Sequence, residues 1–317
     1  MFFLLFLLLP ILISLYRTHK NIYAGKVRYP PGPPGLPFTG NLLQIQTAKP
    51  HKFLWKLSQK YGPLMSLSLG SVPVLVISSA GMAKEALKIH DLVFSGRPAS
   101  VGRQKLSYNR KDIGSSPYSD YWREMREICV LQLFSHKRVQ SIQTIRVEEI
   151  SSMIGTISNL SSSSQLVDLR ALIMSLTSTV ICRVAFGKRY DEEGHKRKQF
   201  DQLLQESQAM IGGFFFLDYF PSLSWIDRLS GMLPRLEKNF NELDLFYEEL
   251  IEEHLNPNRP ESMKNDLLHL LILLKEEQSS IIYPTWDHIK ALLMVRHFPH
   301  NFFPSKSVGN SKELKNN

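Results

Sequence analysis

Trp122 and Arg126 are the two residues of this chain whose types and spacing could do chemistry most directly. They stand four positions apart, so a helix would place both side chains on one face. The indole of Trp122 carries one N–H donor, and the planar guanidinium of Arg126 carries several in a fixed fork. Together they would make a good clamp for a carboxylate. The alternative is structural: Trp122 anchors the core, and Arg126 pairs with Glu124 or another nearby acid.

The clamp needs a helix beneath it and a fixed approach to that helix. A helix is predicted over residues 118–133, after a long loop at 91–117 that Gly, Ser and Pro residues interrupt. Short alternating runs at 64–69 and 73–78 around Gly70-Ser71 predict a β-hairpin. A polar break is expected at 161–164. Apolar periodicity and stop signals predict further helices at 51–60, 79–90 with Ser79 as N-cap, 139–158, 166–186, 195–210, 234–255, 264–275 and 284–294.

Composition indicates a globular protein with a basic surface. The chain has 317 residues and a formal net charge of 38 − 29 = +9. That length fits one large domain or two ordinary ones. Because the basic residues are spread along the chain, a soluble basic surface is favoured over nucleic-acid binding, with attraction to an anionic membrane face or an acidic partner between the two.

Two cysteines, Cys129 and Cys182, are too few for a disulfide scaffold and favour a reducing compartment. Each lies in an apolar, helical context. We therefore expect both thiols to be buried small side chains, not ligands or nucleophiles.

Residues 2–16 form an almost wholly apolar run, and residues 1–18 are close to the length of a membrane span. A cleaved signal peptide is the alternative. However, no basic residue precedes the run and no small-x-small site follows it. Arg17, Lys20, Lys26 and Arg28 come after it instead, which favours an uncleaved anchor with the body in the cytoplasm.

A basic, proline-rich hinge follows at 19–42. Its last fourteen residues, Tyr29-Pro-Pro-Gly-Pro-Pro-Gly-Leu-Pro-Phe-Thr-Gly-Asn-Leu42, contain five prolines and three glycines. Such a segment cannot form a helix or a central strand. It is a stiff linker of polyproline character that would fix how the body sits on a membrane.

From about residue 28 to 294, the order of segments resembles the N-terminal half of a plant microsomal cytochrome P450, especially the large group that oxidises specialised metabolites. The matching pieces are the hinge, Lys60-Tyr61-Gly62-Pro63-Leu64, Val76-Ile77-Ser78-Ser79, Phe94-Ser95-Gly96-Arg97-Pro98, the Trp122/Arg126 segment, Phe134-Ser135-His136-Lys137-Arg138-Val139, Phe186-Gly187-Lys188-Arg189-Tyr190, Asp218-Tyr219-Phe220-Pro221 and His288-Ile289-Lys290-Ala291-Leu292-Leu293-Met294.

The resemblance implies a mainly α fold with a small β-hairpin or sheet: an incomplete cytochrome P450 fold with an N-terminal membrane anchor. Its cofactor would be haem, with Trp122 and Arg126 binding a propionate. Substrate contacts would come from the loop at 97–116 and from the run at 211–216. The candidate contact residues are Leu106, Tyr108, Ile113, Phe214 and Phe215. Gly114-Ser115-Ser116 departs from the more apolar residues usual there.

By the same resemblance, the full-length protein would be a haem-thiolate monooxygenase anchored in the endoplasmic reticulum membrane. It would insert one oxygen atom from O2 into a small apolar plant metabolite. Electrons would come from NADPH–cytochrome P450 reductase, and no nucleic-acid partner is implied.

The resemblance ends at Met294, so the P450-like part is expected at 43–294 and a non-family, disordered tail at 295–317. The family's oxygen-activating segment and its axial-cysteine loop are not found in these residues. No catalytic residue and no metal ligand is therefore assigned, and the literal chain is expected to be inactive. The alternative is a non-catalytic, membrane-anchored helical fragment from a truncated or mis-spliced gene product.

Overall fold

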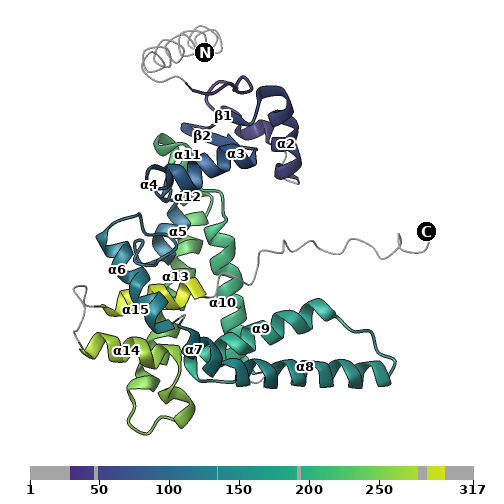
Figure 1. Ribbon diagram of the computed structural model, residues 1–317, viewed down its shortest axis with the longest axis vertical. Coiled ribbons are helices and arrows are strands. Elements are labelled where there is room, and N and C mark those ends of the chain that lie inside the picture. Colours follow the sequence, from purple (N-terminus) through teal and green to yellow (C-terminus); the bar gives the residue numbers. More distant parts are fainter. Residues whose placement is uncertain (1–28, 46–48, 134, 191–193, 278–283, 297–317) are drawn as a thin grey trace. The chain divides into compact units, whose positions relative to one another are not determined.

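The computed structural model describes residues 29–45, 49–133, 135–190, 194–277 and 284–296 (Figure 1). The predicted anchor, the first part of the hinge and most of the predicted tail lie outside the described residues. The chain divides into two compact units. Unit 1 comprises the residues up to Gly96 together with Phe216–Ile226, and unit 2 comprises Arg97–Phe215 together with the residues from Asp227 onward.

Unit 1 is built around the predicted hairpin, which the structure confirms. Strands β1 (Leu64–Leu69) and β2 (Val72–Ile77) pair antiparallel. Gly70 takes a left-handed φ of +60° in the turn between them, a conformation that glycine adopts without steric cost. The hinge runs along β1, because the side-chain oxygen of Asn41 accepts from the backbone N–H of Ser68 at 2.8 Å.

The helices of unit 1 are short. They are α2 (Pro50–Tyr61), α3 (Ala80–Lys84), α4 (Asp91–Phe94) and α11 (Phe216–Tyr219). Ser79 caps α3 as predicted, by accepting from the backbone N–H of Met82, and α3 continues into a π-helical turn at Glu85–Ile89. The hairpin turn donates twice to α11: the backbone N–H and the hydroxyl of Ser71 both reach the Tyr219 carbonyl, at 2.9 and 2.7 Å.

Unit 2 is helical in its described residues. Its helices are α5 (Val101–Leu106), α6 (Asp120–Ile128), α7 (His136–Ser141), α8 (Gln143–Ser162), α9 (Leu169–Phe186), α10 (His195–Ile211), α13 (Met232–Leu255), α14 (Leu267–Glu277) and α15 (Trp286–Arg296), while α12 (Trp225–Leu229) begins in unit 1. A π-helical turn, Cys129–Leu133, extends α6. The predicted mainly α fold with a small sheet is therefore confirmed.

Several elements differ from their predicted bounds. The loop expected at 91–117 contains α4 and α5. Between the helices expected at 195–210 and 234–255, the structure has two further short helices, α11 and α12. The helix expected at 139–158 is two helices, α7 and α8, and α8 runs to Ser162, into the predicted polar break. The last helix, α15, runs from Trp286 to Arg296, so it begins and ends two residues later than the helix expected at 284–294.

The core of unit 2 gathers around α13, which lies against α10 and α14. Phe200 of α10 stacks on Phe246 of α13 with ring centroids 5.2 Å apart, and Phe186 meets both edge-on. Such pairs contribute beyond the apolar area they bury. Cys129 and Cys182 belong to this core with at most 1% of their surface exposed, so their prediction as buried helical residues is confirmed.

Helix α9 alone in the described part of the chain is long and apolar enough to cross a membrane. Its C-terminal half is buried in unit 2, and it ends with Gly187 in the left-handed C-cap position, as the sequence predicts. A buried core helix passes the same test of length and composition. We therefore interpret α9 as a core helix whose N-terminal half is exposed.

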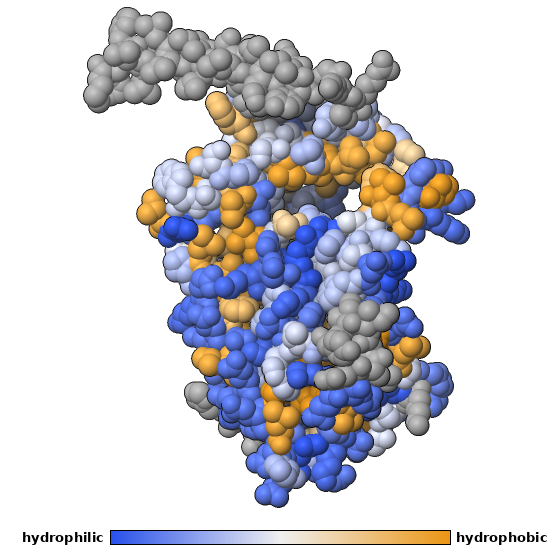
Figure 2. All heavy atoms as spheres, turned by 90° about the vertical axis from the view of Figure 1, so that its left-hand side faces the viewer, coloured by the Kyte–Doolittle hydropathy of each residue, from blue (hydrophilic) through white to orange (hydrophobic). Residues whose placement is uncertain are grey.

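Apolar side chains also reach the surface of both units. Figure 2 shows apolar (orange) and hydrophilic (blue) side chains intermixed over the face it presents. The large apolar residues that are at least two-fifths exposed include Leu36, Phe38, Leu43 and Trp55 in unit 1, and Val147, Ile150, Ile154, Leu169 and Ile173 on α8 and α9 in unit 2. Single exposed apolar residues are ordinary, but a run of them along two adjacent helices is less so.

Substitution of Gly187 tests the end of α9. A Cβ at this position would lie 2.4 Å from the Ser262 carbonyl oxygen, and its φ is +62°. We expect Gly187→Ala to lower the free energy of unfolding by at least about 1–2 kcal/mol, the cost of a left-handed backbone for an L-residue. Urea unfolding followed by circular dichroism measures this.

Gly155→Ala in the middle of α8 is the matched control, because its Cβ would meet nothing within 4 Å. That change should raise the free energy of unfolding by about 0.5–1 kcal/mol through helix propensity. Equal changes in the free energy of unfolding for the two substitutions would contradict the need for glycine at the end of α9.

Candidate functional site

Helix α6 brings Trp122 and Arg126 together as their spacing predicts. Ser119 caps the helix by accepting from the Trp122 backbone N–H at 3.2 Å. One turn later, the Arg126 guanidinium lies over the Trp122 ring, 5.3 Å from its centroid. A cation on an aromatic face is attracted by the ring quadrupole. The indole ring therefore supports the guanidinium and limits its directions.

The Trp122 N–H has a partner within the protein. Its Nε1 donates to the backbone carbonyl of Ile113 at 2.8 Å, and its ring packs on Tyr118 at 5.5 Å. An indole carries one donor, so this bond has to break before Trp122 can donate to a ligand. The half-buried ring thus helps to hold the preceding loop in place, a structural role that differs from the core anchor considered above.

Arg126 differs from Trp122 in this respect. Its side chain is exposed, and it forms no ion pair with any acid in the described ranges. Its neighbour Arg123, by contrast, pairs with Asp120 on the same helix. The structure therefore does not show the alternative in which Arg126 pairs with Glu124. The guanidinium is free to donate hydrogen bonds to the carboxylate of a ligand or to another anion.

The loop before α6 is tightly bonded to itself. Asp112 Oδ1 accepts from the backbone N–H groups of Gly114 and Ser115, both at 2.5 Å. Arg110 donates from Nε to the Ser115 carbonyl at 2.9 Å and from Nη2 to the Arg97 carbonyl at 2.7 Å. Burial raises the pKa of the Asp112 carboxyl above its usual value, although the two backbone donors oppose this. Residues 107–116 therefore form an ordered segment.

The predicted substrate residues occupy three different environments. Leu106 and Phe215 are fully buried in the core of unit 2, with 0% and 1% of their surface exposed. Tyr108 is also buried, and its hydroxyl donates to Asp244. Ile113 is half-buried, and Phe214 is 43% exposed. The structure brings Leu106 and Phe215 into one cluster with Met125 of α6, but it gives them no open surface.

Three charged residues of the same region were missed by sequence reasoning. Asp244 and Glu248 lie on one face of α13, and Lys290 lies on α15 with 6% of its side chain exposed. Lys290 Nζ is 2.6 Å from Asp244 Oδ1 and 3.0 Å from Glu248 Oε1. Its position between Ile289 and Ala291 in an apolar helix was the signal available, since a buried lysine needs carboxylate partners.

Some residues of this region fit haem and others do not. Arg126 suits a propionate, because it offers an exposed guanidinium without an acid. The thiols do not suit iron: burial raises the pKa of Cys129 to about 11 and that of Cys182 to about 12, whereas a ligating thiol has to be deprotonated. Among the residues that the structure describes, no group of three His, Cys, Asp or Glu side chains is arranged to hold a metal ion.

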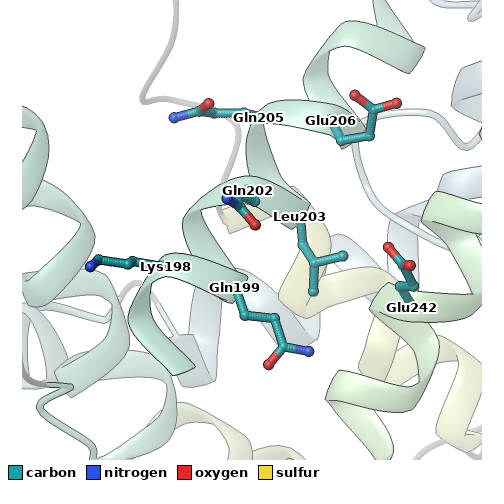
Figure 3. A pocket seen from close by; sticks show the side chains of 7 residues that line it. All are labelled: Lys198, Gln199, Gln202, Leu203, Gln205, Glu206 and Glu242. Carbon is teal, nitrogen blue, oxygen red and sulfur yellow. The ribbon is translucent and has the colours of Figure 1, made fainter. Parts of the chain in front are cut away.

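A groove of about 740 Å³ lies elsewhere on unit 2, between α10 and α13 (Figure 3). Leu203 of α10 faces Glu242 of α13 across it, while Lys198 and Gln205 point to the other side of α10. Glu206, which also lines it, is held by Arg235, and this contact lowers the pKa of its carboxyl. The groove shares no residue with the predicted site and presents no arrangement for catalysis.

Comparison with known proteins assigns this geometry to a family. The cytochrome P450 family model matches residues 30–297. The chain is 47% identical over 296 residues to 6,7,8-trihydroxycoumarin synthase of Pastinaca sativa, covering 92% of this chain and 58% of that protein. It is 48% identical over 278 residues to 5-OH-xanthotoxin synthase of the same plant, covering 87% of this chain and 54% of that one.

A solved zebra fish cytochrome P450 with progesterone is similar to the structure, with a TM-score of 0.61 and 26% identity. The match covers 78% of this chain and 55% of the zebra fish chain. This chain thus spans about half the length of the relatives it matches. On the family model, these relatives and the shared fold, it belongs to the cytochrome P450 family of monooxygenases, and its relatives include plant enzymes of specialised metabolism.

Proposed function

We propose that these 317 residues act as the N-terminal part of a membrane-anchored haem-thiolate monooxygenase of the endoplasmic reticulum. The substrate would be a small apolar plant metabolite of the coumarin or xanthotoxin type named in its relatives. NADPH–cytochrome P450 reductase would supply the electrons. The observation that carries the proposal is the Arg126 guanidinium, which lies on the Trp122 ring without a carboxylate partner among the described residues of a P450 chain.

Within this part, Arg126 would bind a haem propionate. Trp122 would orient the guanidinium through its ring and keep its N–H on the Ile113 carbonyl, or transfer that N–H to the propionate when haem is present. Haem with an axial thiolate supplies the activation of O2. The residues of this chain bind and orient, and none of those described is placed to transfer a proton or to ligate iron.

The axial thiolate would come from outside these 317 residues. Cys129 and Cys182 are both enclosed by apolar side chains of the core, and their raised pKa values keep them neutral at physiological pH. We therefore propose that the 317-residue protein by itself is not a functional monooxygenase. The two interpretations of the sequence are therefore compatible: these residues alone would be a non-catalytic fragment, and together with the part that carries the thiolate they would form the monooxygenase.

A carbon monoxide difference spectrum tests this division. The 317-residue protein, incubated with haem and reduced, should not show the long-wavelength Soret band of thiolate-ligated haem. A fusion of residues 1–294 to the part of 6,7,8-trihydroxycoumarin synthase that follows its matched half should show it. If the 317-residue protein shows this band, the axial thiolate does not come from outside these residues. If a folded fusion lacks the band, the proposed function is wrong.

Replacing Arg126 tests the propionate contact. In the fusion, Arg126→Ala should weaken haem retention by about 2 kcal/mol, the size of a hydrogen bond to a charged group, or roughly thirtyfold. Transfer of haem to apomyoglobin measures the retention. Arg123→Ala is the matched control, because Arg123 is a surface residue of the same helix that pairs with Asp120, and it should leave retention within twofold. Equal losses in the two variants would indicate a general effect on α6.

The two thiols can be tested without haem. Cys129 is 1% exposed, and burial raises its pKa to about 11 from an ordinary 9.0, so at pH 8 iodoacetamide should alkylate it at least about 100-fold more slowly than a free cysteine. The rate should rise about tenfold for each unit of pH below that pKa. In urea, both thiols should react at the ordinary rate. Fast alkylation of either thiol in the folded protein would contradict its exclusion as an iron ligand.

A further inference from the structure

Tyr108 joins three parts of unit 2 through partly buried polar contacts. Its hydroxyl donates to Asp244 Oδ1 on α13 at 2.7 Å. Lys290 Nζ on α15 donates to the same oxygen at 2.6 Å and to Glu248 at 3.0 Å. We name Tyr108, Asp244, Glu248 and Lys290 the Tyr108 cluster. It connects the loop at 107–116 with two core helices that are distant from it in sequence.

The cluster is stable only when all its members are paired. Tyr108 is 7% exposed and the Lys290 side chain 6% exposed, so neither can turn to water. Burial, followed by the bond to Asp244, raises the pKa of the Tyr108 hydroxyl far above its ordinary value, and the hydroxyl remains a donor at any physiological pH. The side chains of Asp244 and Glu248 are 28% and 52% exposed, so the buried members depend on them more than the reverse. Removal of Asp244 would leave the buried Tyr108 hydroxyl without its acceptor.

The backbone of the loop at 107–116 is strained, so it requires contacts that hold it in place. Tyr108, Asn109 and Arg110 take φ angles of 51°, 61° and 67°, three successive left-handed residues of which none is glycine. Side-chain-bearing residues adopt that region at a cost in free energy, and they keep it only where surrounding contacts impose it. Here the Tyr108 cluster holds the first of the three residues, and the bonds of Arg110 to the Ser115 and Arg97 carbonyls hold the third.

The same loop reaches the clamp on α6. Five residues after Tyr108, the Ile113 carbonyl accepts the Trp122 N–H, and Trp122 carries Arg126 on its ring. Displacement of the loop would therefore move the acceptor of Trp122. A contiguous chain of contacts runs from Lys290 through Asp244, Tyr108 and the loop to Trp122.

We infer that the Tyr108 cluster is a positioning device for the loop at 107–116 and that Tyr108 positions this loop instead of contacting substrate. This rests on the proposed function and on the substrate contact that the family resemblance implies for the loop at 97–116. It also reassigns Tyr108, which the family resemblance made a candidate apolar contact for the substrate. The ring is occupied as well, since it packs on Phe240 at 5.1 Å.

Tyr108→Phe is the decisive variant, because it removes the hydroxyl and keeps the ring. Hydrogen–deuterium exchange of the 317-residue protein and of the fusion should show amides 109–116 exchanging on the order of tenfold faster, the effect of one buried hydrogen bond to a charged group. In the fusion, the dissociation constant for xanthotoxin as a probe should rise by a similar factor, while the haem content of the purified protein is unchanged. Asp244→Asn should act in the same direction.

Lys111→Met is the matched control. Lys111 also links this loop to α15, through Asp287 at 2.6 Å, but that pair is one-third to one-half exposed, and its loss should change exchange and binding less than twofold. The variants Tyr108→Phe and Asp244→Asn should not be additive, because both act on the Tyr108–Asp244 bond: the first removes the donor and the second removes the charge of the acceptor.

Unchanged exchange at 109–116 in Tyr108→Phe would overturn the inference. So would a loss of folded haem protein with an unchanged dissociation constant for xanthotoxin, since that is the result of a merely structural role. A fusion that lacks the thiolate Soret band but whose loop exchanges faster would refute the proposed function and leave the positioning role in place.

Discussion

The need to pair every buried polar group is the constraint on which the site region of unit 2 depends. The connection from α5 to α6 carries a tyrosine hydroxyl, a carboxylate and several backbone donors into or beside the core. An unpaired group of this kind costs more than a made hydrogen bond contributes. The loop accordingly takes a shape in which Asp112 accepts from its own turn and Tyr108 reaches Asp244, even though three residues have to adopt a left-handed backbone.

This pairing rule also explains why the two members of the clamp behave differently. Trp122 has one donor and lies half-buried, so its N–H is bound to the Ile113 carbonyl. Arg126 is exposed and has donors to spare, so solvent satisfies it and a ligand can compete. The residue pair first suggested two equivalent donors to one carboxylate. The structure separates their roles into a ring that supports and a guanidinium that is available.

The cysteines show the same physics acting against a ligand. A thiol becomes a good ligand where nearby positive charge or a polar setting stabilises the thiolate. Cys129 lies at the end of α6, one turn beyond the clamp, and could have been thought close enough to serve. Its neighbours in the core are apolar, and its pKa rises because nothing there stabilises the charge. Proximity in sequence to a proposed cofactor contact thus does not by itself make a thiol able to bind iron.

The sequence predicted those features of the fold that local chemistry determines. The spacing of Trp122 and Arg126, the hairpin around Gly70-Ser71 and the C-cap at Gly187 all follow from residues near one another in the chain. Helix α5 was missed because it is only six residues long and tertiary contact stabilises it: Gly102 lies so close to the Met210 carbonyl that a Cβ would be 2.1 Å from it. Such a contact leaves no periodic signal.

For a related reason, the sequence alone could not distinguish residues predicted to contact substrate from residues of the core. Leu106 and Phe215 have the apolar side chains that line a pocket, but the same side chains fill a core, and only the fold decides between the two. Tyr108 could be separated only once Asp244 and Lys290 were seen beside it, from helices more than a hundred residues away. A residue whose role depends on nearby residues of the chain can be predicted from the sequence. A residue whose role depends on the packing of distant helices can be identified only from the structure.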